Sequence, residues 1–153
     1  MRRACKLSIL FTCIAFTAFV SACAPAYDAA RFRADFGLGV AAYDAGDYGE
    51  AARYWQPLAD RYDLAAMRNM GNLYRRGLGV EKNPKKALAY YEAAAKRGFA
   101  PAQYAAALMH VSNDGVPYDG DKAIMWLTRA AQGGFAPAKA QLQRLTMRSQ
   151  PFN

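Results

Sequence analysis

The stretch that decides the fold is Arg97–Tyr104, which reads RGFAPAQY and returns as GGFAPAKA at Gly133–Ala140, thirty-six residues further on. When Ala66–Pro101 is laid over Ala102–Pro137 without a gap, eleven of the thirty-six positions are identical. A fixed period of this length is typical of stacked helical repeats, in which every unit builds the same structure. The sequence therefore predicts a repeat protein.

The repeated stretch has the chemistry of a joint between two helices. Gly98 can adopt the left-handed conformation that ends a helix, and Phe99 can fold back on the last turn. Pro101 follows where the next helix begins, because the missing N–H of proline costs little at that position. The same three residue types return thirty-six positions later. We therefore expect the same helix-to-helix joint to be built twice.

A second column of the repeat indicates where helices begin. Asp47, Asn83 and Asp119 share one register, and each precedes a helical run. Asp and Asn side chains accept hydrogen bonds from the free N–H groups of a first helical turn. Pro84 follows Asn83, at a position where proline suits a helix start. We expect all three residues to be helix caps.

These signals predict an all-α fold, an α-solenoid of antiparallel helix pairs. Its length of 153 residues allows one domain with a modest core. About three pairs are expected, followed by a capping helix that covers the last apolar face. The expected helices are 29–45 and 48–61, 65–76 and 84–97, 101–112 and 120–132, and the cap at 137–147. The solenoid as a whole is expected to span 29–148, with a short tail at 149–153.

The first residues have the layout of a bacterial secretory signal, with a basic start, an apolar run and small residues at the end. The apolar run Leu7–Val20 is shorter than the roughly 20 residues that a membrane-spanning helix needs. It ends in Val20-Ser21-Ala22-Cys23, which resembles the lipobox of bacterial lipoproteins. That resemblance implies a signal peptide at 1–22, acylation (palmitate among the chains) of Cys23, and a lipidated tether at 23–28. The alternatives are an uncleaved anchor or a simple secreted protein.

Charge and cysteine content exclude several classes of protein. Cys5 and Cys13 would leave with the signal, so no disulfide is expected in the mature chain. The formal charge of +8 falls to +5 without the three cations of the signal. This excess mildly favours anionic surfaces and does not indicate a nucleic-acid partner. Several acyl chains would hold the protein stably on a membrane.

One family motif extends over about Leu64–Lys139 and includes Gly77-Leu-Gly-Val80, Lys86-Ala87 and Ala94-Ala95. It resembles the Sel-1-like repeat family, relatives of the tetratricopeptide repeats. The unit with Gly77-Leu-Gly-Val80 is a strong match, whereas the next unit has Asn113 in place of the first loop glycine and His110 in the column of Tyr74. The first unit is different, because its Gly46-Asp47-Tyr48-Gly49 resembles a tetratricopeptide unit whose loop is four residues shorter. We expect a hybrid of one such unit, two Sel-1-like units and the cap.

In the tetratricopeptide family the first helix of each pair lines a concave groove that binds a partner. The resemblance places nine residues of the helix pairs in such a groove: Phe36, Val40, Tyr43, Arg68, Asn72, Arg75, Tyr104, Leu108 and Val111. The capping helix would add Ala140, Arg144 and Met147. Aromatic and arginine side chains are common at binding hot spots, and two arginines can clamp an anionic group. The open alternatives are that the arginines are solvated charges and that Tyr104 and Leu108 pack within a tighter stack.

Enzymatic chemistry finds little support in the sequence. His110 and Ser112 are two residues apart on one helix, so they point to different faces and cannot form a nucleophile–base pair. We expect His110 to be a core residue. The carboxylates at 114, 119 and 121 lack the spacing of a calcium loop, and turn chemistry with a helix cap explains them. No catalytic residue, metal site or cofactor is predicted.

We therefore expect a non-catalytic adaptor of the bacterial cell envelope, anchored through Cys23 and holding an envelope protein or peptide segment in its groove. Because Ala24 and not Asp follows Cys23, the resemblance favours the outer membrane, facing the periplasm. Two alternatives remain open. One is a secreted virulence or immune-modulating protein, and the other is a Sel-1-like protein that recognises peptidoglycan or penicillin.

Overall fold

The computed structural model describes residues 29–148, and of 146–148 only the backbone. The predicted signal peptide, Cys23 with its tether, and the tail at 149–153 lie outside the described residues. The described residues form seven helices and no strand, which confirms the all-α prediction. The helices are α2 (Ala29–Asp44), α3 (Tyr48–Asp60), α4 (Leu64–Arg76), α5 (Pro84–Lys96), α6 (Ala100–Ser112), α7 (Gly120–Gln132) and α8 (Ala136–Arg148). Every boundary lies within one residue of the predicted one.

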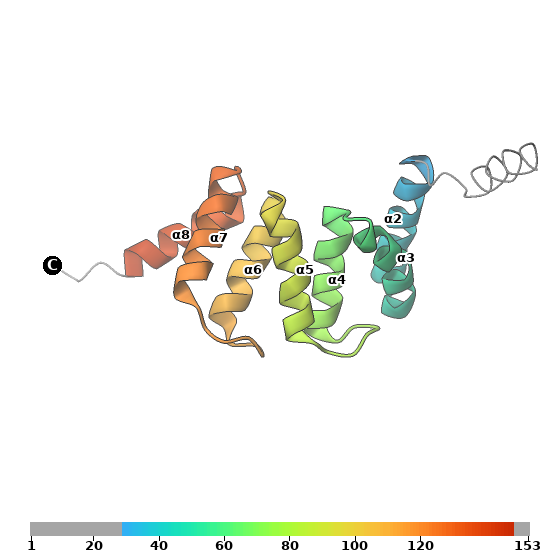
Figure 1. The fold of residues 1–153 in the computed structure, drawn as a ribbon, viewed down its shortest axis with the longest axis horizontal. Coiled ribbons are helices and arrows are strands. Elements are labelled where there is room, and N and C mark those ends of the chain that lie inside the picture. Colours follow the sequence, from blue (N-terminus) through green and yellow to red (C-terminus); the bar gives the residue numbers. More distant parts are fainter. Residues whose placement is uncertain (1–28, 149–153) are drawn as a thin grey trace, which may run out of the picture. The chain divides into compact units, whose positions relative to one another are not determined.

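From Arg33 onward the described helices form one compact unit. Each helix in α3–α8 packs against the next one in the chain, and Figure 1 shows them side by side in chain order. Contacts also join α4 to α6 across the intervening α5. The first helices of successive pairs therefore form one layer of the stack and the second helices form the other.

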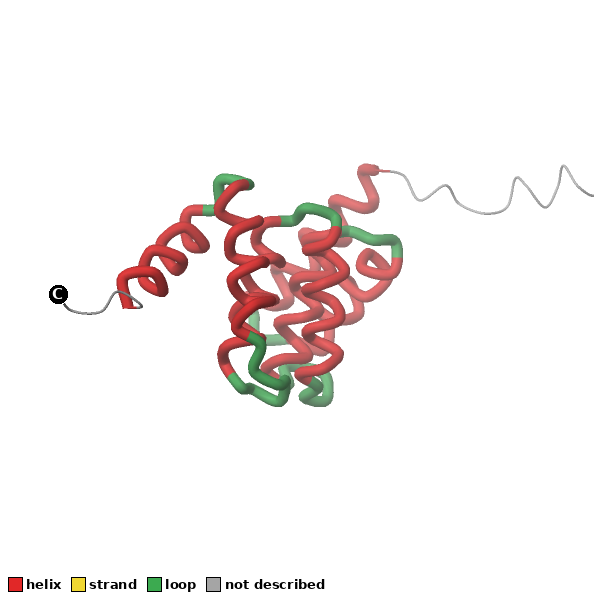
Figure 2. The backbone as a smooth tube through the Cα atoms, turned by 60° about the vertical axis from the view of Figure 1, so that its left-hand side comes forward, coloured by secondary structure: helices red, strands yellow, loops and turns green. Residues whose placement is uncertain are grey.

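The connections between helices gather at two opposite edges of the stack (Figure 2). The joint edge holds the short connections from a second helix to the next first helix, at 61–63, 97–99 and 133–135. The long-loop edge holds the seven-residue loops at 77–83 and 113–119 and the three-residue turn at 45–47. The turn of the first pair is thus four residues shorter than the loops, as the sequence predicts.

All three joints share one hydrogen-bond pattern. At the middle joint, Gly98 has φ of +85° and its N–H donates to the Ala95 carbonyl, while the Phe99 N–H donates to the Ala94 carbonyl. This is the Schellman arrangement, which ends a helix with a left-handed residue. The joint at Gly134 repeats it. The predicted joints are therefore confirmed.

The first joint repeats these bonds with a residue that we did not predict in this role. Tyr62 has φ of +65° and donates to the Ala59 carbonyl, and the Asp63 N–H donates to the Leu58 carbonyl. Left-handed backbone is unfavourable for a residue with a side chain, above all a bulky one. Tyr62 stands thirty-six residues before Gly98, so the first unit uses a strained tyrosine where the others use glycine.

The predicted caps are confirmed by their hydrogen bonds. Asp47, Asn83 and Asp119 each accept through a side-chain oxygen from the backbone N–H three residues later, at 2.9–3.2 Å. Asp63 caps α4 in the same way through the Ala66 N–H, at 2.6 Å. Each such bond satisfies one of the donors that a helix start leaves without an intrahelical partner.

Large side chains of the second helices pack directly on glycines of the first helices. Trp55 is 2% exposed and its ring lies on Gly39, while Tyr91 is fully buried with its ring on Gly71. A Cβ atom at either glycine would collide with the ring opposite. In the third pair the same two columns hold Leu127 and Ala107, both buried. Glycine in the first helix therefore makes room for the aromatic ring.

We predict that the sign of φ decides the effect of adding a methyl group to this chain. An added Cβ meets no atom within 4 Å at Gly98 or at Gly37, and only Gly98 has a positive φ. Gly98→Ala should therefore lower the unfolding free energy by about 1 kcal/mol. Gly37→Ala should raise it by roughly 0.5–1 kcal/mol, because alanine favours a helix over glycine. Urea unfolding of both variants measures this, and equal effects of the two would contradict it.

Candidate functional site

A solvent-accessible hollow of about 330 Å³ lies between α2 and α4. It is lined by Val40 and Tyr43 from α2, by Trp55 from α3, and by Arg68, Asn69 and Asn72 from α4. Four of these six residues were predicted to line the groove. The hollow therefore lies on the layer of first helices, at the N-terminal end of the stack.

Tyr43 and Trp55 form an aromatic wall of the hollow, backed by Phe36, which was predicted to line the groove but does not line the hollow. The Trp55 ring lies 5.7 Å from the Tyr43 ring and 6.2 Å from the Phe36 ring, between centroids. Trp55 Nε1 donates to the Phe36 carbonyl at 3.3 Å, which fixes the orientation of the indole. Tyr43 also makes an edge contact with Tyr48, at 5.1 Å. Aromatic pairs in this geometry form a rigid apolar surface.

A hydrogen bond from the core orients one amide of the hollow. The Tyr91 hydroxyl donates to Asn72 Oδ1 at 2.7 Å. Burial raises the pKa of Tyr91 to about 12, against the opposing influence of Arg75 and Arg68, so the phenol remains a donor at neutral pH. Because Oδ1 of Asn72 is engaged, its NH₂ group is the donor that remains for a ligand.

The hollow and its surroundings are cationic. Arg68 is exposed, and its Nη1 makes a 3.4 Å contact with Asn69 Oδ1. Arg76 Nη1 donates to the Tyr43 hydroxyl at 3.1 Å. None of the six lining residues is a carboxylate. An arginine beside two amides and an aromatic wall suits an extended peptide with an acidic side chain, since guanidinium groups pair with carboxylates.

The remaining predicted groove residues lie outside this hollow. Arg75 Nε is 3.6 Å from Asp114 Oδ2, so Arg75 is engaged at the long-loop edge. Tyr104 is half-buried with its ring 5.5 Å from that of Phe135. Leu108 is half-buried on α6. The structure thus brings Tyr43, Arg68 and Asn72 together and separates them from the α6 residues.

Val111 lines a second hollow, of about 270 Å³, at the C-terminal end of the stack. Its other lining residues are Tyr118, Gly120, Ala123, Ile124, Leu142 and Leu145. Leu142 and Leu145 are half-buried, whereas Met70 and Leu73, in the same two columns of α4, are buried. The second hollow therefore lies where a further helix pair would continue the stack.

Two residues of the first hollow were not predicted, Trp55 and Asn69. Trp55 belongs to a second helix, and the tetratricopeptide resemblance assigns the groove to first helices alone. The signal that could have found it is Gly39, because a glycine facing a large aromatic lets the ring reach the opposite layer. Asn69 precedes Asn72 by three residues and so shares its helix face.

The comparisons with known proteins identify the repeat. The model of the Sel1 repeat matches residues 64–99 and 100–135, which are α4–α5 and α6–α7 with their loops and joints. This is a Sel-1-like repeat protein. Both matched units end in a Gly-Phe joint, at Phe99 and at Phe135, so the predicted period and family are confirmed.

Solved structures of Sel-1-like proteins resemble the chain over most of its length. The Sel1 repeat protein from Oxalobacter formigenes has a TM-score of 0.69 and 32% identity, over 74% of this chain and 46% of that one. The c5321 protein, a protective antigen present in uropathogenic Escherichia coli strains that displays an SLR fold, has a TM-score of 0.73 and 26% identity, over 78% of this chain and 27% of that one. The chain thus spans less than half of either protein. A comparison with curated proteins gave no match.

Sel-1-like repeat proteins are generally non-catalytic scaffolds that bind other proteins. In this one, His110 is 3% exposed, and its Nε2 is 3.3 Å from Glu92 Oε1, which confirms the core prediction. Ser112 Oγ donates to the Met109 carbonyl. No three metal-ligating side chains gather anywhere in residues 29–148. Over the same residues, no helix combines the length and the apolar character that a membrane crossing requires.

We predict that Asp114 makes the stability of this Sel-1-like protein sensitive to acid. Lys82, at 3.1 Å, and Arg75 hold the pKa of Asp114 below its ordinary value of 3.8. A carboxyl with a lowered folded-state pKa stabilises the fold above its unfolded-state pKa, and this stabilisation is lost as pH falls through the folded-state value. Asp114→Asn should therefore be less stable than wild type at neutral pH. The difference should close below pH 3.8.

Thermal unfolding of both proteins across that pH range measures this effect. Asp121→Asn is the matched control, because Asp121 is exposed and has no ion pair with any residue of the described part. A gap between wild type and Asp114→Asn that stays constant in acid would show that the carboxylate charge is not what stabilises the loop.

Proposed function

We propose that this protein is a non-catalytic adaptor of the bacterial cell envelope, anchored by lipid on Cys23, and that the hollow between α2 and α4 holds an acidic peptide segment of another envelope protein. The observation that carries the proposal is the composition of the hollow. It combines Arg68, two amides and an aromatic wall, with no carboxylate.

Arg68 and Asn72 each keep hydrogen-bond donors that a bound peptide can engage. Arg68 is exposed on a rigid helix, so its guanidinium can pair with a carboxylate that enters the hollow. The Asn72 amide is already oriented by Tyr91, so less side-chain entropy is lost when it binds a peptide carbonyl. The wall of Tyr43 and Trp55 supports apolar contact beside the polar pair.

The anchor is supported by the sequence Val20-Ser21-Ala22-Cys23 after an apolar run. Ala24 follows, which favours the outer membrane facing the periplasm. The family supports a protein partner in general. We therefore propose a tethered scaffold that retains its partner near the bilayer.

The anchor predicts labelling by palmitate. Wild type grown with a labelled palmitate should carry the label, and Cys23→Ala should lose it, because the thiol of Cys23 is the acceptor. Cys13→Ala is the matched control and should keep the label, since Cys13 would leave with the signal. Label that persists in Cys23→Ala, or is absent from wild type, would refute lipid attachment at this residue.

We predict that binding of a partner in the hollow depends on the positive charge of Arg68. Crosslinking and purification from intact native cells should capture one envelope protein with wild type. Arg68→Glu should reduce its yield about tenfold, which corresponds to about 1.4 kcal/mol. Lys85→Glu reverses an exposed charge on α5 away from the hollow and should leave the yield unchanged.

The outcomes of this capture separate the candidate functions. Equal yields from both charge variants would show that the partner binds elsewhere. Capture of a protein from the culture medium would favour a secreted virulence role. Capture of muropeptides would favour a cell-wall role.

A further inference from the structure

The charged side chains of the stack are distributed unequally between its two edges. Four of the five ion pairs found among the described residues lie at the long-loop edge: Arg53 with Glu50, Arg75 and Lys82 with Asp114, and Lys122 with Asp119. The fifth joins His110 to Glu92 in the interior. Cations and carboxylates of the long-loop edge therefore largely neutralise one another.

The joint edge carries more cations than carboxylates. Its basic side chains are Arg33, Arg61, Lys96, Arg97, Arg129 and Lys139, and its carboxylates are Asp35, Asp60 and Asp63. Among these carboxylates, Asp63 caps α4 and Asp60 accepts from Gln56. Within the described part of the chain, neither Lys96 nor Lys139 has an ion pair. The joint edge thus carries a net positive charge, to which Lys96 and Lys139 contribute without an ion pair in the described part of the chain.

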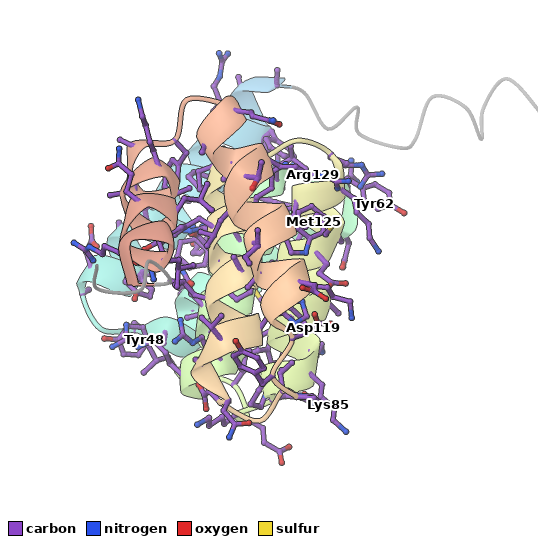
Figure 3. All side chains as sticks on the ribbon, turned by 90° about the vertical axis from the view of Figure 1, so that its left-hand side faces the viewer. Tyr48, Tyr62, Lys85, Asp119, Met125 and Arg129 are labelled. Atoms are coloured by element: carbon purple, nitrogen blue, oxygen red, sulfur yellow. The ribbon has the colours of Figure 1, made fainter. Side chains whose placement is uncertain are left out.

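An exposed aromatic stands at the first joint of this edge, beside the middle joint. Tyr62 is 60% exposed, and the Arg97 guanidinium lies over its ring at 3.9 Å from the centroid. Tyr62 keeps a left-handed backbone where the other two joints have glycine. The joint requires left-handed backbone at this position but does not require a tyrosine, and glycine adopts that backbone at lower cost. A strained, exposed tyrosine kept there points to a function of its side chain. Figure 3 shows Tyr62 and Arg129 toward the joint edge and Lys85 toward the opposite one.

We infer that the joint edge, which includes Tyr62 and Arg97, is a surface that rests on an anionic phospholipid bilayer. Basic side chains attract anionic headgroups, and tyrosine has an apolar ring with a polar tip that suits the boundary between headgroups and acyl chains. The charge and the exposed tyrosine support this inference without reference to the lipid anchor.

Chain connectivity agrees with the same orientation. Because α2 runs antiparallel to α3, the chain enters the stack at the joint edge, near Arg33. Only Ala24–Asp28 separates Cys23 from α2, a span of at most roughly 20 Å. A lipid on Cys23 would therefore bring this edge, and not the long-loop edge, to the bilayer. This last step rests on the proposed function.

The test is lysine footprinting of the full chain mixed with vesicles, and sedimentation of the vesicles reports whether the chain binds them. The vesicles are phosphatidylcholine with or without roughly one-third phosphatidylglycerol. Acetylation of Lys96 and Lys139 should fall about threefold or more in the anionic vesicles and recover in about 0.5 M NaCl. Lys82 and Lys85 at the long-loop edge should react equally in both. Mass spectrometry of the peptides reads each lysine.

Two charge reversals on one helix serve as matched variants. Lys96 ends α5 at the joint edge, and Lys85 lies near its start at the long-loop edge. Lys96→Glu should abolish the protection of Lys139 by anionic vesicles, and Lys85→Glu should leave it intact. Thermal unfolding confirms that both variants fold.

The outcomes distinguish this inference from the proposed function. If the chain sediments with both kinds of vesicle and Lys96 is not protected, the lipid anchor stands and the joint edge does not contact the bilayer. If the chain sediments only with anionic vesicles and Lys96 is protected, the joint edge contacts the bilayer and the lipid anchor on Cys23 is refuted. Protection of Lys82 and Lys85 instead would show that the long-loop edge contacts the bilayer, and would overturn the inference. Lys96 and Lys139 that are protected only by an acidic protein from the capture experiment would make this a protein interface.

Discussion

The left-handed residue at each joint is the constraint on which the rest of the stack depends. The N–H of the residue that follows it reaches back to a carbonyl five positions earlier, so the next helix leaves in one direction only. Three joints with the same bonds repeat the same displacement, which keeps the first helices in one layer. The two edges of the stack and the hollow between α2 and α4 follow from that repetition. The cost of left-handed backbone is negligible at Gly98 and Gly134 and is borne by the side chain at Tyr62.

Most of the fold could be predicted from the sequence because its signals are local and repeated. Caps, glycine stops and prolines recur at a fixed spacing, so each boundary was marked several times. The left-handed backbone of Tyr62 was not predicted, because the predictions relied on such local signals. A tyrosine carries no signal for left-handed backbone, and only its column, shared with Gly98 and Gly134, could have revealed it. The hydrogen bonds of the joint overrode the preference of the residue.

The candidate site was less predictable. The position of a residue in the repeat indicates which face of its helix it lies on, but not which residues of other units contact it. Arg68 and Arg75 are seven residues apart on one face, yet Asp114 from the loop of the next unit engages Arg75 and leaves Arg68 exposed. Tyr104 packs against Phe135 of the following joint instead of lining the hollow. Trp55 reaches the hollow from the second layer only because Gly39 makes room for it. Each of these contacts depends on a residue from another helix, and the sequence pattern of a single helix carries no information about that residue.

The separation of charge between the edges bears on how the hollow can be used. Every helix runs from the joint edge to the long-loop edge, so a stack with its joint edge on a bilayer has its helices upright. The layer of first helices is then a wall at right angles to the membrane, and the hollow opens sideways. Arg68 lies in the second turn of α4 from the joint edge, whereas Arg75 lies in the last turn. A peptide that pairs with Arg68 would therefore bind close to the membrane surface, beside the cations that hold the edge there. In this arrangement the joints direct each new helix pair of the stack, and they also set the distance from the membrane at which a partner is bound.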